Sequence, residues 1–192
     1  MFKRLNDDII DKKINGFLYE HKKTKVIHYV GPLFVSQILN KYKKSDISIY
    51  FNLNENYLES NLEGILFCIY SDEHFSLIFH WKKNENILYH YDSIPNYHKE
   101  SAYILKKILK KTNILNITKF KIVTPNFCPL QNSHWECGYF VYLISEIIIS
   151  KEKITPLSKA DSKRNIFTFS LNNCLLEFNK IKLSNINNSN SF

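Results

Sequence analysis

The chain has 192 residues, of which 44% are hydrophobic and 15% aromatic. This length allows one domain with a full core, and this composition excludes an intrinsically disordered chain. The net charge of +8 comes from lysine, because Arg4 and Arg164 are the only arginines and lysine supplies the other 24 of the 26 basic residues. Reading of base edges favours arginine, so we expect no nucleic-acid partner and attribute the lysines to coding bias, with a basic nucleic-acid binder as an alternative.

The four cysteines, Cys68, Cys128, Cys137 and Cys174, form no C-x-x-C pair and no spacing suited to zinc or to a disulfide framework. We therefore expect free thiols and no metal site. No charged-then-apolar leader opens the sequence, and no apolar run approaches the roughly 18 residues that span a bilayer. These features predict a reducing location, cytoplasmic or nuclear, and no membrane partner.

Two helices are predicted near the start of the chain. Between Asn6 and Lys22 the apolar residues recur at helical spacing, with Asn6 or Asp7 placed to cap the first turn. A second helix follows Gly31 and Pro32, because proline is tolerated at the first helical position and disfavours the helical conformation in the residue before it.

The middle of the chain predicts β-structure. Short apolar and aromatic runs at residues 64–70, 75–79 and 87–91 indicate three strands. The polar segment 82–86 joins the last two, which we therefore expect to form a hairpin.

The second half predicts a helix over residues 101–111, which carry apolar side chains on one face, and a fourth strand over residues 119–124. A polar loop, residues 130–136, then runs into a segment from Cys137 to Ile148 that is apolar nearly all round, as is typical of a buried helix. A last helix is predicted over residues 172–182. We see no internal repeat.

The end of the chain is rich in Ser and Asn and offers little to bury. We therefore predict one domain over residues 1–183 and a disordered polar tail over residues 184–192.

Candidate chemistry centres on Cys137, because the N-terminus of a buried helix stabilises a thiolate. His74 begins one predicted strand and Asp92 follows the next, so the hairpin would place a base and its orienting carboxylate at the same edge of the sheet. Gln131 precedes Cys137 by six residues, close enough for its amide to bind the same oxyanion as the backbone N–H of Cys137.

Each of these residues also has a simpler interpretation. A lone cysteine in an apolar segment is more often an inert core residue, and we assign Cys68 and Cys174 to packing and leave Cys128 open. Taken alone, His74 fits a surface histidine, and Asp92 with the following Ser93 fits a turn. The combination of base, carboxylate and nucleophile is what favours a catalytic site.

Four segments in sequence order carry a resemblance. Residues 4–10 resemble a W-L-N-D-x-x-I motif, 73–77 an H-W-x-L strand, 90–93 a Y-D-S turn, and 131–138 a Q-x5-C-G motif. In this order the motifs resemble the Ulp1/SENP family of ubiquitin-like-protein proteases, and the likeness extends from Arg4 to about Lys182.

The resemblance implies an α+β, papain-like fold in which a mixed sheet packs against the helix that begins at Cys137. It implies Cys137 as nucleophile, His74 as general base and then acid, Asp92 as the residue that orients His74, and Gln131 as an oxyanion donor. The reaction would be thiol proteolysis after the C-terminal Gly-Gly of a ubiquitin-like modifier, without metal or organic cofactor.

The short chain and the segment from Pro32 to Phe51 resemble the NEDD8-specific branch of the family. We therefore expect a NEDD8-like modifier as partner, cleaved from its precursor or from target lysines, and a monomeric enzyme. Two alternatives stay open: a SUMO or ubiquitin protease of the same family, and a module that binds a ubiquitin-like modifier without cleaving it.

Three departures from the motifs affect the expected substrate tunnel. Arg4 and Phe75 stand where the family has tryptophans that flank the Gly-Gly tail, and Glu136 replaces the Asp that precedes the cysteine. Phe75 can still stack on a glycine backbone, and Arg4 can do so through its guanidinium plane. We expect altered specificity with the chemistry intact.

Other residues of the motifs are candidates for substrate contact. Asp7 and Gly138 are expected to bind the substrate. Trp135 would cover the tail in place of a lost tryptophan, although an aromatic beside a site loop is more often a packing residue. His134 is a rival base, ranked below His74 because no strand fixes it and only Glu136 could orient it.

Overall fold

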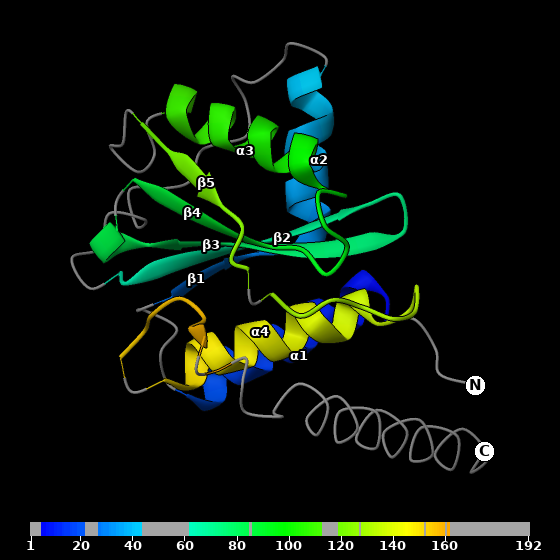
Figure 1. Cartoon of the computed structure of the whole chain (residues 1–192), viewed down its shortest axis with the longest axis vertical. Coiled ribbons are helices and arrows are strands. Elements are labelled where there is room, and N and C mark those ends of the chain that lie inside the picture. Colours follow the sequence, from blue (N-terminus) through cyan, green and yellow to red (C-terminus); the bar gives the residue numbers. More distant parts are fainter. Residues whose placement is uncertain are drawn as a thin grey trace, which may run out of the picture.

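A computed structural model describes most of the chain (Figure 1). The described residues are 5–21, 27–43, 62–84, 86–112, 119–126, 128–151, 153–159 and 161. Three sequence predictions therefore lie outside the described residues: the tunnel role of Arg4, the packing role of Cys174, and the helix over 172–182 with the tail that follows it.

Along the chain, helices alternate with single strands or with a run of central strands. The elements are α1 (Asp7–Glu20), β1 (Ile27–Val30), α2 (Pro32–Lys43), β2 (Gly64–Ser71), β3 (His74–Trp81), the short 3-10 helix η2 (Lys82–Asn84), β4 (Ile87–Tyr91), α3 (Lys99–Thr112), β5 (Lys121–Val123) and α4 (Cys137–Ser150). The helices predicted at 6–22, 101–111 and 137–148 are confirmed, and so is the one after Gly31 and Pro32.

The strands form one mixed sheet in the order β1-β2-β3-β4-β5. β2, β3 and β4 pair antiparallel, while β1 and β5 lie parallel to their neighbours at the two edges. The predicted hairpin of β3 and β4 is confirmed, with Leu77 opposite Tyr91. This arrangement of helices and a mixed sheet confirms the predicted α+β class.

Two layers of helix cover the sheet, one on each face (Figure 1). On one face α1 and α4 pack with residues such as Leu66, Leu77 and Phe79. On the other, α2 and α3 cover residues such as Phe67 and Ile78. Because side chains alternate along a strand, neighbouring residues of β2 and β3 enter different cores, and both central strands are buried on both sides.

Local sequence explains where the first helix begins. The Asn6 side chain accepts a hydrogen bond from the Ile9 backbone N–H at 3.0 Å, which confirms one of the two predicted caps. Strand β1 was not predicted, because its four residues carry no clear alternation and the strand is stabilised by parallel pairing with β2, far along the chain.

The helix α4 is buried along nearly its whole length, as its apolar sequence predicts. Gly138 lies where α4 approaches α1 and the segment before it. A Cβ atom at this position would stand 3.0 Å from Ile10 Cδ1 and 3.1 Å from Leu5 Cβ. Glycine therefore permits the close packing that places the start of α4. None of the helices within the described ranges is both long and apolar enough to cross a membrane.

Candidate active site

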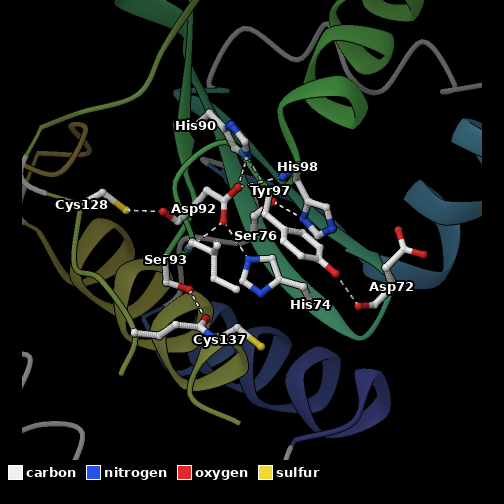
Figure 2. A network of polar contacts seen from close by, with 12 residues as sticks. Asp72, His74, Ser76, His90, Asp92, Ser93, Tyr97, His98, Cys128 and Cys137 are labelled. Atoms are coloured by element: carbon white, nitrogen blue, oxygen red, sulfur yellow. Dashed lines mark hydrogen bonds and ion pairs between the residues drawn. The ribbon is translucent and has the colours of Figure 1, made fainter. Parts of the chain in front are cut away.

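The hairpin of β3 and β4 brings two predicted site residues together. His74 is the first residue of β3 and Asp92 follows the last residue of β4. His74 Nε2 lies 2.7 Å from Asp92 Oδ1, and both side chains are almost fully buried (Figure 2). The pairing expected from the sequence is therefore present as a direct, charge-assisted hydrogen bond.

The Asp92 carboxylate is held by backbone groups as well as by His74. Its Oδ1 accepts from the Ile94 N–H at 3.1 Å, and its Oδ2 accepts from the His98 N–H at 2.9 Å. Burial works against ionisation, but the hydrogen bonds from His74 and from the His98 backbone outweigh it and hold the pKa of Asp92 below its usual value. Asp92 is thus a fixed, ionised partner for the imidazole.

His74 is the link between this carboxylate and the cysteine. Figure 2 shows its ring between the Asp92 carboxylate and the Cys137 sulfur. Burial favours the neutral ring, yet hydrogen bonds to Asp92 and then to Cys137 overcome it and raise the pKa of His74 to about 9. At neutral pH the ring is therefore an imidazolium, as a cysteine–histidine ion pair requires.

Cys137 is the first residue of α4 and is fully buried. Its sulfur therefore lies at the positive end of a 14-residue helix, where a thiolate is stabilised by the helix dipole and the N-terminal amides. The other described cysteines lack such a setting. Burial raises the pKa of Cys128 to about 12 and raises that of Cys68, in the middle of β2, as well, so both remain protonated thiols.

The carboxylate of Glu136 supports the loop before the nucleophile. Its Oε2 accepts from the backbone N–H groups of Asn132 at 2.6 Å and Ser133 at 2.9 Å. Glu136 is 7% exposed, so these contacts are shielded from water. The longer side chain that stands in place of the family's aspartate thus has specific partners.

Gln131 is tied to the residue that follows Asp92. Its backbone N–H donates to the Ser93 carbonyl at 3.1 Å, and its Oε1 accepts from Ser93 Oγ at 2.7 Å. Its Nε2 donates to the Ser133 carbonyl at 3.0 Å, which uses one of the two amide hydrogens. The structure orients this amide beside the site loop, and its binding of an oxyanion stays a prediction.

The predicted substrate-binding residues have mixed surroundings. Asp7 is partly exposed in the first turn of α1. Phe75 is 1% exposed and stacks on Tyr70, with ring centroids 4.3 Å apart. Trp135 packs edge-on against Tyr139, which favours its packing interpretation. Contact of these residues with a substrate stays a prediction, as it does for Gly138, which has the packing role described above.

His134 does not occupy the position of a base. Its side chain is exposed, and its recorded contact with Cys137 is a long one, 4.0 Å from the cysteine sulfur to the His134 backbone carbonyl. The carboxylate that orients a histidine in this site is Asp92, and it bonds to His74. The structure therefore favours His74 over His134.

Sequence reasoning missed a second layer of buried polar groups behind the His74–Asp92 pair. His98, His90 and Ser76 are all less than 5% exposed. Burial lowers the pKa of His98 to about 4 and also lowers that of His90, so both rings are neutral. A signal was present: Ser76 and His90 interrupt otherwise apolar strands at positions that alternate with core residues.

No group of three or more His, Cys, Asp or Glu side chains within the described ranges is arranged to hold a metal ion. The groups that the structure gathers at this site are a thiol, an imidazole, a carboxylate and a side-chain amide.

No protein-family model matches the sequence, and no curated protein matches it either. Solved structures do. A de-sumoylating protease aligns with a TM-score of 0.65 at 18% identity, over 96% of this chain and 85% of its own. The catalytic domain of the Ulp1-like SUMO protease of Chaetomium thermophilum aligns with a TM-score of 0.57 at 18% identity, over 77% of this chain and 62% of its own.

A third structure, the Xanthomonas campestris effector protein XopD bound to ubiquitin, aligns with a TM-score of 0.56 at 14% identity, over 78% of this chain and 76% of its own. At identities this low, the structural alignments show a shared architecture alone. The chain therefore has the fold of an Ulp1-like protease catalytic domain.

Proposed function

We propose that the protein is a cysteine peptidase that cleaves after the C-terminal glycine of a ubiquitin-like modifier. The observation that supports this most strongly is the buried 2.7 Å contact between His74 and Asp92, with the same imidazole bonded to Cys137 at the start of a buried helix. The shared fold with Ulp1-like proteases and the order of the four sequence motifs support the substrate class.

In the proposed reaction the Cys137 thiolate attacks the carbonyl carbon of the terminal glycine. The oxyanion of the tetrahedral intermediate is bound by the backbone N–H of Cys137 and by the Gln131 amide. The His74 imidazolium gives its proton to the leaving amine, and a thioester to Cys137 remains. The neutral His74 then takes a proton from the water that attacks the thioester. The C–S bond breaks, the modifier leaves with a C-terminal carboxyl group, and the Cys137 thiolate and the His74 imidazolium are restored.

Asp92 serves this cycle in two ways. It fixes the His74 ring by its bond to Nε2, which leaves Nδ1 for the exchange of protons with sulfur, leaving group and water. Its negative charge also stabilises the imidazolium that exists before attack. The Glu136 carboxylate and Ser93 would hold the loop and the Gln131 amide in register with Cys137.

The choice of modifier is part of the proposal. The resemblance of residues 32–51 to the NEDD8-specific branch favours NEDD8, whereas the solved structures described above are two proteases named for SUMO and an effector protein bound to ubiquitin. We propose NEDD8 first and SUMO as the alternative, with ubiquitin third. Cys68, Cys128 and Cys137 form no disulfide with one another, which is in keeping with action in a reducing compartment, the cytoplasm or nucleus.

The test is incubation with NEDD8, SUMO and ubiquitin, each carrying a C-terminal electrophile, with intact mass as the readout. An adduct with one modifier, absent in Cys137→Ala, is the expected result and identifies both nucleophile and partner. Modification of Cys137→Ala to the same extent would refute Cys137 as nucleophile. Tight binding of a modifier by folded protein without any adduct would support the non-catalytic binding module instead.

A further inference from the structure

The turn that precedes His74 adopts an unfavourable backbone conformation. Asp72 and Glu73, which join β2 to β3, have φ angles of 47° and 61°. Two positive φ angles are what a two-residue hairpin turn with the usual strand twist needs, but side chains other than glycine pay an energetic cost for them. Because His74 comes directly after this turn, contacts that hold the turn also set the position of the base.

Residue His98, just before α3, is bonded to both strands that meet at this turn. Its Nε2 lies 3.0 Å from Ser71 Oγ and 3.3 Å from the Ser71 carbonyl, and its Nδ1 lies 2.8 Å from Ser76 Oγ. Ser71 is paired with His74 across the hairpin, and Ser76 follows His74 by two residues. The His98 ring therefore joins β2 to β3 close to the base, and Figure 2 shows it beside Ser76 and His74.

The hydrogen positions follow from the partners. A backbone carbonyl can only accept, so we assign the ring hydrogen of His98 to Nε2, and Nδ1 then accepts from the Ser76 hydroxyl. Ser76 Oγ in turn accepts from His90 Nε2, 3.2 Å away. With the His98 and His90 rings neutral, these contacts satisfy both ring nitrogens of His98 and Nε2 of His90, as a low-dielectric interior demands.

The same short segment contacts the other member of the pair and the base itself. The His98 backbone N–H donates to Asp92 Oδ2 at 2.9 Å, while Oδ1 bonds to His74. The Tyr97 hydroxyl donates to the Asp72 carbonyl at 2.9 Å, and the Tyr97 ring lies 4.7 Å from the His74 ring, centroid to centroid. Two consecutive residues thus touch the turn, the imidazole and the carboxylate.

We propose that Tyr97 and His98 form a positioning clamp, which holds the His74 ring against the Asp92 carboxylate. The effect of the clamp on catalysis rests on the proposed function. Its effect on the position of His74 rests on the contacts alone. Neither residue is catalytic in the strict sense, since both act through the His74–Asp92 pair. Ser76 supports the clamp, because its hydroxyl donates to His98 Nδ1 and accepts from His90 Nε2.

The main variant is His98→Leu, which keeps the approximate volume and the backbone N–H but removes the hydrogen bonds of both ring nitrogens. We expect the rate of adduct formation at saturating probe to fall about 10- to 100-fold, as is usual for groups that orient a reacting residue, with little change in the half-saturating probe concentration. Tyr97→Phe, which loses only the bond to Asp72, should show a smaller loss. His80→Leu is the matched control: it removes a different buried histidine, in β3, whose ring contacts the Ile87 carbonyl, and it should leave the rate unchanged.

A double-mutant cycle separates positioning from simple loss of folding. If the clamp acts through the His74–Asp92 pair, His98→Leu should cost little more in an Asp92→Asn background than Asp92→Asn costs alone. The same fold-loss in both backgrounds would overturn the proposal. Equal unfolding midpoints of His98→Leu and His80→Leu would show that the comparison is made on folded protein.

The pKa of His74, measured by NMR titration of protein without substrate, tests the clamp even if no probe reacts. We expect it to be lower in His98→Leu than in wild type, and unchanged in His80→Leu. Should wild type form no adduct while this difference is seen, the peptidase function fails and the clamp stands. An unchanged pKa of His74 in folded His98→Leu overturns the clamp whatever the outcome with the probes.

Discussion

The two halves of the proposed site are supported in different ways. The base half, His74 and Asp92, lies at the end of central strands and is surrounded by buried side chains that bond to one another. The nucleophile half is a loop whose backbone amides converge on one carboxylate, that of Glu136. Changes near the base should therefore alter the pKa of His74. Changes in the loop should alter the rate of adduct formation and the stability, and should leave the pKa of His74 unchanged.

The largest effect is expected for Asp92→Asn. Without the carboxylate, burial is no longer outweighed, so the pKa of His74 falls from about 9 and less of the imidazolium is present at neutral pH. The rate of probe adduct formation should fall about 100-fold or more, which is the range of a misplaced general base. The descending alkaline limb of the pH–rate profile should move to lower pH. An alkaline limb at the wild-type pH would contradict the assigned role of Asp92.

Glu136→Ala should have the next largest effect, on the other half of the site. The amides of Asn132 and Ser133 lose a buried, charged acceptor, which costs about 2 kcal/mol of unfolding free energy. Adduct formation should slow by roughly 10- to 30-fold if this free energy is also lost from the ordered loop in the transition state, because each 1.4 kcal/mol is a factor of ten. Denaturant unfolding and probe kinetics measure both.

Glu136→Asp is the control for this prediction, since it keeps the charge and shortens the side chain by one methylene. It should lie between wild type and Glu136→Ala in both measurements. A change in the alkaline limb for either variant would mean that the two halves are not independent.

Folding stability should depend on pH in opposite directions through His74 and through His98. The folded-state pKa of His74 is raised to about 9, so its contribution is complete below pH 6.5 and is lost as the pH rises through 9. The folded-state pKa of His98 is lowered to about 4, so its contribution is complete above pH 6.5 and is lost as the pH falls toward 4. From these two groups, stability should be greatest near pH 6.5.

The acid side of this curve is the more diagnostic one. Loss of the His98 contribution amounts to up to about 3 kcal/mol of unfolding free energy between pH 6.5 and 4. Denaturant unfolding of wild type and His98→Leu over that interval measures it. The variant should be less stable than wild type at pH 7 and should show a shallower decline on acidification. Parallel curves would show that His98 is not a buried neutral group.

The smallest effect is expected for Ser93→Ala. It removes the 2.7 Å hydrogen bond to Gln131 Oε1 and leaves the backbone bond between the two residues. The net value of one such bond, about 1 kcal/mol, predicts a several-fold slower adduct formation. The alkaline limb should not move. Gln131→Ala should cost more, and combination with Ser93→Ala should add little if both act through the same amide.

Much of this architecture follows from local patterns. Helical periodicity and a cap at Asn6 predict α1, aromatic runs predict the central strands, and the polar turn predicts the β3–β4 hairpin that joins His74 to Asp92. These features are encoded over short distances, where turn chemistry and periodicity act directly. Strand β1 is the counterexample, because its pairing with β2 depends on residues far away in the sequence.

The sequence by itself determined the helices, the central strands, and the candidacy of Cys137, His74, Asp92 and Gln131. Only the tertiary structure decided which cysteine lies beside the imidazole, that Glu136 supports the loop, and that His98 meets Ser71 and Ser76 around the base. The physical reason is that buried polar groups must find partners wherever the packed chain places them. Those partners come from separate elements, and periodicity and turn signals do not report on them.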